Sequence, residues 1–162
     1  MTPQLRFPEF TDDWQVKKLG SLFSYEQPTK YLVSSTDYAD GYDTPVLTAG
    51  KTFVLGKTDE SHGIFQESLP ITLFDDFTTA SQWVDFPFKL KSSAAKILKA
   101  KDGYNPKIAH EILQKIKFKA DDHQRYWIST YQNFDVKIPS KPEQEKIADF
   151  LTAVDERIAV GE

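Results

Sequence analysis

The sequence predicts an α+β protein, with a β-rich mixed-sheet domain and a few helices followed by one C-terminal helix. The first observation behind this is a series of short apolar runs separated by turn residues, which favours strands over a helical bundle. The second is a pair of strong helix signals, one beginning at Asn105 and the other at Ser140. The third is an aromatic content of 14% in 162 residues, enough to fill the interior of one domain.

The elements are expected in the following order. The first ten residues form an extended arm, and a strand or turn then leads into a short helix near Gly20. Trp14 in this region is expected to be a buried anchor rather than a base-stacking residue. Short strands follow at Tyr31–Val33, Pro45–Leu47, Thr52–Leu55, Ile64–Phe65 and Leu69–Phe74. An aromatic run, Trp83–Phe88, comes next, and Lys89–Leu98 is expected to pair as a hairpin.

A helix is predicted to begin after Asn105, which is a favourable N-cap residue. Pro106 suits the first helical position, where its missing N–H costs little, and apolar residues recur along one face of the following turns. Beyond this helix, Phe134, Val136 and Ile138 alternate with polar residues, which is typical of a half-buried final strand.

The terminal stretch Ile138–Ile158 reads IPSKPEQEKIADFLTAVDERI and predicts a second helix. Ser140 and Glu143 fit a capping box, with Pro142 in the first turn. Apolar residues then recur at the spacing of a coiled-coil seam, broadened by one aromatic ring. The seam consists of Ile147, Phe150, Leu151, Val154 and Ile158. Either the helix folds back on its own domain, or it is a spacer or assembly helix that a second chain or domain completes.

The composition narrows the classes of function. The chain has no cysteine, which excludes disulfides and thiolate metal sites. No apolar run approaches the roughly 20 residues that span a bilayer, and the N-terminus lacks the basic start and apolar core of a secretory signal. A cytoplasmic protein without a membrane segment is therefore expected.

The charge is unevenly distributed around a net value of −4. Residues 1–86 have a net charge of −7, residues 87–141 of +7 and residues 142–162 of −4. A basic segment between acidic ones favours phosphate locally, while the acidic flanks limit indiscriminate binding. The alternative is that lysines on solvated helix and strand faces cluster by chance.

Several stretches give the sequence a family resemblance. The Pro-rich, Glu-Gln-containing start of the terminal helix and the opening LRFPEFTDDWQVKKLGSLF (Leu5–Phe23) resemble DNA-specificity subunits of Type I restriction-modification systems. TPVLTAGKT (Thr44–Thr52) and LFDDFTTA (Leu73–Ala80) resemble them more loosely. The resemblance implies a target-recognition domain over residues 1–139 and the start of a spacer helix over residues 140–162.

The resemblance also implies DNA recognition without catalysis. One such domain reads half of a bipartite duplex target through side chains in the major groove, and its spacer helix docks the DNA methyltransferase (modification) subunit. That subunit carries S-adenosylmethionine and performs the chemistry, and a restriction subunit joins for cleavage, so no cofactor is expected in this chain. A second copy of the chain, or a second recognition domain, supplies the other half-site.

Two polar clusters and several lysines supply the side chains that DNA recognition requires. In Thr78–Trp83, Gln82 suits a bidentate contact with adenine, and in Gln124–Trp127, Arg125 suits the acceptors of guanine. Every one of these residues has the alternative role of a turn or core residue. The residues predicted to bind DNA are Lys51, Thr79, Ser81, Gln82, Lys89, Lys91, Gln124, Arg125 and Tyr126.

Two other functions compete with this interpretation. The three histidines lack the spacing of a metal-binding motif, but Asp75 and Asp76, with Glu67 or Asp85, could hold Mg²⁺ for phosphodiester cleavage. Adjacent strand residues point to opposite faces, so neither a catalytic residue nor a metal site is predicted. The other candidate is a protein-binding or DNA-mimicking regulator of the same complexes, which the acidic N-terminal half supports.

Overall fold

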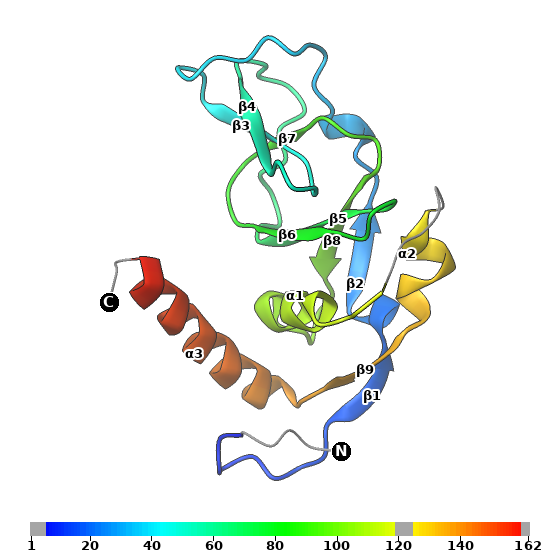
Figure 1. The fold of residues 1–162 in the computed structure, drawn as a ribbon. Coiled ribbons are helices and arrows are strands. Elements are labelled where there is room, and N and C mark those ends of the chain that lie inside the picture. Colours follow the sequence, from blue (N-terminus) through cyan, green and yellow to red (C-terminus); the bar gives the residue numbers. More distant parts are fainter. Residues whose placement is uncertain (1–5, 119–124, 160–162) are drawn as a thin grey trace.

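The computed structural model describes residues 6–118 and 125–159, which form three small sheets, two short helices and a longer C-terminal helix (Figure 1). The central sheet has four antiparallel strands in the order β2-β8-β5-β6. Its strands are β2 (Phe23–Glu26), β8 (Ala95–Ala100), β5 (Ile71–Asp75) and β6 (Ser81–Val84). The predicted α+β class is thereby confirmed.

A second sheet with the order β4-β3-β7 lies above the central sheet in the view of Figure 1. In it β3 pairs with β4 in antiparallel and with β7 in parallel orientation. The strands are β3 (Thr44–Leu47), β4 (Val54–Thr58) and β7 (Lys89–Leu90), and the turn η2 (Thr29–Tyr31) precedes them. Buried side chains such as Leu47 and Phe65 pack against Leu73 and Ile97 of the central sheet, so the two sheets share one core.

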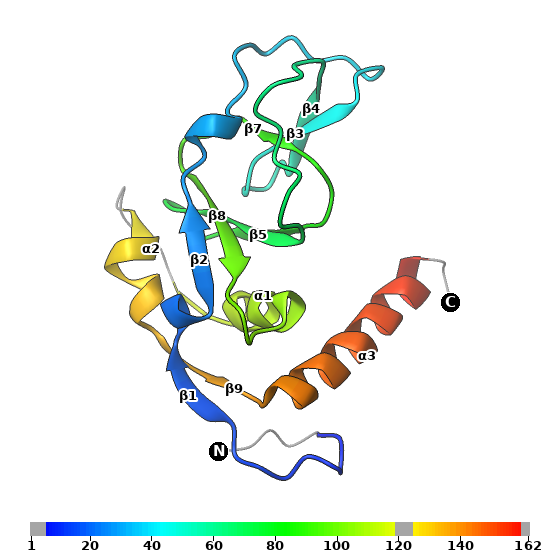
Figure 2. The ribbon, with the colours of Figure 1, turned by 180° about the vertical axis from the view of Figure 1, so that it is seen from behind.

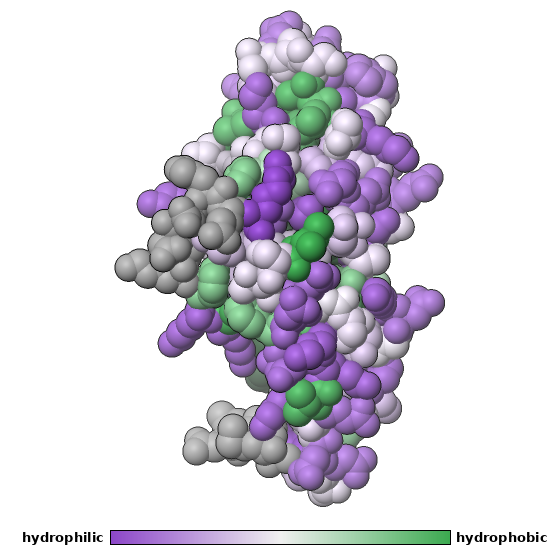
Figure 3. All heavy atoms as spheres, turned by 90° about the vertical axis from the view of Figure 1, so that its right-hand side faces the viewer, coloured by the Kyte–Doolittle hydropathy of each residue, from purple (hydrophilic) through white to green (hydrophobic). Residues whose placement is uncertain are grey.

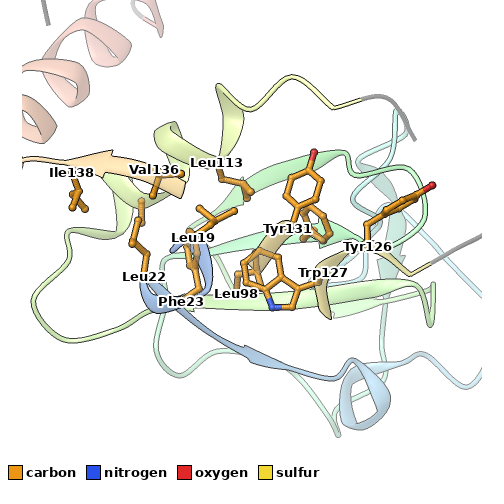
Figure 4. Packing of buried hydrophobic residues seen from close by; sticks show 12 residues of the cluster. Leu19, Leu22, Phe23, Leu98, Leu113, Tyr126, Trp127, Tyr131, Val136 and Ile138 are labelled. Atoms are coloured by element: carbon orange, nitrogen blue, oxygen red, sulfur yellow. The ribbon is translucent and has the colours of Figure 1, made fainter. Parts of the chain in front are cut away.

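The opposite face of the central sheet is covered by helices and by a two-stranded ribbon. The covering elements are β1 (Gln15–Lys18), η1 (Leu19–Ser21), α1 (Pro106–Gln114), α2 (Tyr126–Ser129), η3 (Tyr131–Asn133) and β9 (Asp135–Ile138), of which β1 pairs with β9. Figure 4 shows their core, in which the Trp127 ring lies 6.0 Å from that of Phe23 and 5.6 Å from that of Phe74.

The central sheet has a core on each side because its side chains alternate between two apolar environments. Phe74 and Leu98 belong to the cluster beneath the helices, whereas their neighbours Leu73 and Ile97 belong to the cluster beneath the second sheet. Four consecutive buried residues in β5 and in β8 follow from this arrangement, since a strand covered on both faces has no solvent-exposed side.

The start of α1 is fixed by the residues that the sequence predicted. The Asn105 side chain accepts hydrogen bonds from the backbone N–H groups of Lys107 at 2.9 Å and Ile108 at 3.2 Å, and Pro106 occupies the first turn. Ile108, Ala109 and Leu113 are buried on one face. The prediction of this helix is confirmed, and so is that of the final strand, which is β9.

The C-terminal helix α3 (Lys141–Ala159) follows β9 and slants away from α1 and β9 toward its C-terminal end (Figures 1 and 2). The N-terminal arm runs beside the start of this helix, and the rings of Phe7 and Phe150 are 6.0 Å apart. Helix α3 begins next to the predicted boundary between residues 139 and 140, although the division into two functional units stays a prediction. Among the described residues, no helix is long and apolar enough to cross a membrane.

Three local predictions are wrong, and the first is the strand Ile64–Phe65, of which Phe65 forms only an isolated bridge with Phe88. Lys89–Leu98 is not a hairpin, because β7 pairs with β3 in the second sheet while β8 pairs with β2 and β5 in the central one. The intervening residues 91–94 instead carry the chain from one sheet to the other. Tyr31–Val33 is also no regular strand: Tyr31 ends the turn η2, and Leu32 forms only an isolated bridge with Leu90.

Candidate nucleic-acid interface

The turn between β5 and β6 is built by two adjacent aspartates with different roles. Asp75 closes the turn, because its carboxylate accepts hydrogen bonds from the backbone N–H groups of Phe77 and Thr78, both at 2.9 Å. Thr79 completes the turn with a positive φ of 63°. Asp76 points the other way and is fully buried, so the two carboxylates do not converge.

Asp76 joins three segments that are distant in sequence, and we call this set of contacts the Asp76 junction. Its N–H donates to the carbonyl of Ala94 at 2.9 Å, and its carbonyl accepts from the N–H of Tyr126 at 2.9 Å. Its Oδ1 accepts from the N–H of Trp127 at 2.8 Å. The turn after β5, the loop before β8 and the start of α2 are therefore held at one point.

The second oxygen of Asp76 faces two cations. Lys96 Nζ and Arg125 Nη1 both lie 3.6 Å from Asp76 Oδ2, and neither makes a hydrogen bond with it. The Lys96 side chain is 2% exposed, whereas that of Arg125 is 53% exposed. The Arg125 guanidinium also lies over the Phe77 ring, 5.0 Å from its centroid.

This arrangement places a half-exposed guanidinium over an aromatic ring in a turn that continues with two threonines. We call the surface formed by Phe77, Thr78, Thr79 and Arg125 the α2 face. Lys91 is exposed in the loop that also contains Ala94, and its N–H donates to the carbonyl of Leu47 in the second sheet. Figure 3 shows the side of the molecule that carries α2, and this side is largely hydrophilic with only scattered hydrophobic residues.

Thr79 is anchored to the core behind the α2 face. Burial raises the pKa of the Tyr131 phenol, and the Thr79 side chain beside it opposes this rise. The Tyr131 ring in turn lies 5.0 Å from that of Phe74. The turn is thus fixed from its side chains as well as from its backbone.

A buried histidine supports the same sheet from the side of α1. His110 is 5% exposed, its Nδ1 lies 2.9 Å from the hydroxyl of Thr72, and its ring packs against Trp83 at 5.4 Å. Burial, reinforced by the charge of Lys107, lowers the pKa of His110 to about 4. A neutral imidazole that bonds to a core threonine is a packing residue rather than a metal ligand.

A second buried carboxylate fixes the start of α3, and we call its contacts the Glu143 junction. Arg6 donates from Nε to Glu143 Oε2 at 2.8 Å and from Nη2 to Oε1 at 2.7 Å. Trp14 donates to the same carboxylate at 3.3 Å. The predicted capping-box role of Glu143 is therefore replaced by a pair that ties the N-terminal arm to the helix.

Helix α1 holds α3 from the other side through polar contacts. The Asn105 N–H donates to Gln144 Oε1 at 2.8 Å, and its side chain donates to Glu145 at 3.0 Å. A hydrogen bond from Lys141 lowers the pKa of Glu145, which keeps this carboxylate charged. Further along the helix, Lys107 Nζ lies 3.2 Å from Asp155.

The predicted apolar seam of α3 is divided between two environments. Ile147 and Leu151 line a cavity of about 370 Å³ between α1, β9 and α3, together with Trp14. Phe150, Val154 and Ile158 are 56%, 37% and 68% exposed. Ile147 and Leu151 therefore face the domain, whereas three large hydrophobic side chains, one of them from between these two residues, are left on the surface.

Comparison with known proteins identifies the family of the chain. Residues 11–161 match the family model described as the Type I restriction modification DNA specificity domain. The chain belongs to this family. It is also 50% identical over 133 residues to the EcoR124I/EcoR124II specificity subunit of Escherichia coli, a match that covers 79% of this chain and 33% of that protein. The chain thus spans about a third of the length of this curated relative.

Solved structures support the same fold for this specificity domain. The Type I restriction-modification S subunit of M. genitalium aligns with a TM-score of 0.72 at 18% identity, over 98% of this chain and 43% of that one. The HsdS subunit of Thermoanaerobacter tengcongensis aligns with a TM-score of 0.54 at 14% identity, over 98% and 41% of the two chains. The protein is a DNA specificity domain of a Type I restriction-modification system. It belongs to the family of specificity subunits, which are not catalytic.

The predicted DNA-binding residues of this specificity domain fall into separate groups. Arg125 lies over Phe77, which is in the same turn as Thr79, and Lys91 is exposed in the loop before β8. Gln82 forms a second group with the loop between β3 and β4, because its side chain donates to the carbonyl of Gly50 at 3.5 Å, next to exposed Lys51. The Ser81 hydroxyl is bonded to Gln114 at 2.6 Å and is thus already partnered.

Burial argues against two predicted residues of the specificity domain. Lys89 is fully buried, where its Nζ donates to the His62 carbonyl at 2.6 Å and lies 3.3 Å from Glu60, so it is not exposed for phosphate. Tyr126 is 4% exposed, and its ring packs 5.1 Å from that of Phe118. The core alternative for Tyr126 is therefore the correct one, while Gln124 lies outside the described residues.

The carboxylates considered for a metal site have structural roles in this domain. Asp75 caps a turn and Asp76 joins three segments, and no group of three or more metal-ligating side chains lies within residues 6–118 and 125–159. Sequence reasoning missed both junctions. Arg6 and Glu143 are 137 positions apart, so no local pattern indicates that they pair.

Proposed function

We propose that this specificity domain reads one half of a bipartite duplex DNA target through the α2 face. The observation that carries the proposal is the Arg125 guanidinium, half exposed above a rigidly bonded junction. Arginine in such a position can donate two parallel hydrogen bonds to the acceptors of guanine or to a phosphate. The threonines that follow Phe77 in the same turn would supply base-edge contacts, and exposed Lys91 would supply a phosphate contact, of the kinds that such interfaces use.

We propose that α3 is the assembly element of the same protein. Phe150, Val154 and Ile158 expose apolar surface that a second helix would bury. The Glu143 junction fixes the start of α3 and therefore the orientation of this surface. The predicted partners are the DNA methyltransferase subunit, which would supply S-adenosylmethionine and the chemistry, and a restriction subunit. The second half-site would come from another recognition domain or a second copy of this chain, and the complex is expected in the cytoplasm.

The test of half-site reading is to reconstitute the chain with its methyltransferase subunit and map the adenines that become methylated on random-sequence duplex DNA. We expect methylation confined to a short defined sequence, or to two copies of it separated by a fixed gap. Methylation without any shared sequence would contradict the proposal. A protein-binding regulator or a DNA mimic would give neither methylation nor salt-sensitive duplex binding.

The test of assembly uses Ile158→Glu, which puts a charge on the exposed apolar side of α3. We expect it to weaken recovery of the methyltransferase subunit in co-purification, because a charge cannot be buried there without a partner. Thr152→Glu, at an exposed polar position of the same helix, is the matched control and should assemble normally. Equal recovery with both variants would assign docking to another surface.

Pairing of two copies can be followed separately by sedimentation. If two chains associate through α3, two-fold symmetry requires a symmetric gapped target. We expect dimers or a mixed complex at tens of micromolar, and Ile158→Glu should dissociate the dimers. A chain that stays monomeric both alone and with the methyltransferase subunit would count against pairing.

A further inference from the structure

The Asp76 junction contains one more cation than its carboxylate needs. Lys96 and Arg125 both approach Asp76 Oδ2 to 3.6 Å, yet they differ completely in exposure, at 2% and 53%. A buried carboxylate requires one counter-charge to remain ionised in the core. The second cation is therefore not required for the burial of Asp76, and its position on the surface calls for another explanation.

Lys96 is the permanent counter-charge of Asp76, because it is buried beside it. Its stem is enclosed in β8, and its ammonium lies both beside Asp76 and over the Tyr25 ring, 4.8 Å from the centroid. Arg125 is bound more loosely, through an ion pair without a hydrogen bond and through stacking on Phe77. A ligand can displace the Arg125 contact and leave the buried Asp76–Lys96 pair neutral.

We propose that Asp76 and Lys96 are positioning residues for DNA specificity, which hold Arg125 above Phe77 in the free protein and allow it to move to the DNA without leaving a buried carboxylate unpaired. This inference rests on the proposed function of the α2 face. Neither residue touches DNA in this arrangement, since both are buried. Their effect on recognition passes through the guanidinium that they orient and release.

The proposal makes a distinctive claim about Lys96. In Lys96→Met the apolar stem is retained, but Arg125 becomes the single counter-charge of Asp76. Transfer of Arg125 to DNA would then leave a buried carboxylate alone, so the variant should bind its target more weakly although no DNA-contacting group has changed. In Asp76→Asn/Lys96→Met both buried charges are removed, and Arg125 loses the partner that orients it.

The experiment compares reconstituted complexes on two probes, the duplex identified by methylation mapping and a scrambled duplex of equal length and composition. The measured quantity is the ratio of the two affinities at one salt concentration. We expect Lys96→Met and Asp76→Asn/Lys96→Met each to lower this ratio about ten-fold or more, the size of one lost bidentate base contact. Adding Arg125→Ala to the double variant should lower it no further, because all three changes remove one interaction.

A matched control is the other fully buried lysine. Lys89 pairs with Glu60 in the second sheet, so Lys89→Met makes the same chemical change away from the α2 face and should leave the ratio unchanged. Circular dichroism of every variant separates lost recognition from lost folding, and a Lys96→Met protein that misfolds is replaced by the double variant. An unchanged ratio in folded Lys96 variants, or an equal fall in Lys89→Met, overturns the inference. A wild-type complex that does not discriminate between the probes overturns the proposed function itself.

Discussion

The Asp76 and Glu143 junctions use the same chemistry and reach different results. Each is a carboxylate that is about 1% exposed, each is paired with an arginine, and each joins segments far apart in sequence. Arg6 donates two hydrogen bonds of 2.8 and 2.7 Å to Glu143, and its side chain is 12% exposed. Arg125 stays 3.6 Å from Asp76 and is 53% exposed.

The difference separates a structural ion pair from one that can exchange partners. At the Glu143 junction the Arg6 guanidinium donates its hydrogen bonds to the protein itself, and these bonds fix the N-terminal arm against α3. At the Asp76 junction the buried contacts come from backbone N–H groups and from Lys96, so the donors of Arg125 are not committed to its carboxylate. A buried acidic residue beside an arginine is thus not enough to assign a role. The length of the contact and the exposure of the arginine decide it.

The largest loss of stability is expected when the Asp76 junction is removed. Asp76→Ala leaves the Lys96 ammonium buried and the Trp127 N–H without its acceptor, and we expect a loss of about 3–5 kcal/mol in the free energy of unfolding. Urea unfolding followed by tryptophan fluorescence measures it. Asp75→Ala, which removes only a turn cap, is the control and should cost about 1 kcal/mol. Similar losses in the two variants would contradict the central place of Asp76.

The pH dependence of stability tests the role of His110 in the sheet behind the α2 face. Because burial lowers the pKa of His110 to about 4 from 6.5, the folded state binds a proton less readily than the unfolded chain. Its contribution to stability is complete above pH 6.5 and is lost as the pH falls toward 4, by up to about 3 kcal/mol. His110→Gln should flatten this part of the stability profile, whereas the exposed residue His62, replaced by alanine, should not. A profile identical in all three proteins would place the acid sensitivity elsewhere.

Removal of the Glu143 junction should have a local effect. In Glu143→Ala the Arg6 guanidinium can turn to water, so we expect the arm and the first turns of α3 to detach while both cores remain folded. Hydrogen exchange should become faster at residues 6–14 and 141–147 and stay unchanged in β5 and β8. Asp149→Ala, which removes an exposed carboxylate from the same helix, should change little. Loss of protection across the central sheet would show that the arm supports the whole domain.

The smallest effect on stability is expected from Arg125. Its pair with Asp76 is long and half exposed, so Arg125→Ala should change the free energy of unfolding by less than about 1 kcal/mol. Thermal unfolding beside Arg6→Ala provides the comparison, since the second arginine is committed to the fold. If Arg125→Ala were the more destabilising of the two, the distinction between the junctions would be wrong.

Local signals in the sequence were sufficient for the regular elements. The Asn105-Pro106 start, the alternation ending at Ile138 and the spacing in α3 depend on neighbouring residues, and the structure contains all three elements. The pairing of strands was harder to predict from the sequence. The error at Lys89–Leu98 arose because two adjacent strands belong to different sheets, and a sequence pattern contains no information about distant partners.

The candidate site was predicted only in part for the same reason. Arg125 and Thr79 were recognised by their residue type, but their meeting depends on Asp76, whose sequence context also fits a metal ligand. Lys89 and Tyr126 show the limit of residue type, since a lysine and a tyrosine look equally suitable for DNA whether exposed or buried. Three-dimensional burial separated these residues, and composition could not.

The most direct test of the account is the loss of affinity caused by Arg125→Ala on the mapped target and on scrambled DNA, measured in the reconstituted complex. We expect Arg125→Ala to weaken target binding about ten-fold or more with little change on scrambled DNA. Lys91→Ala, which removes the proposed phosphate contact, should weaken both alike and reduce the salt dependence. Equal losses on both duplexes for Arg125→Ala would contradict sequence reading by the α2 face.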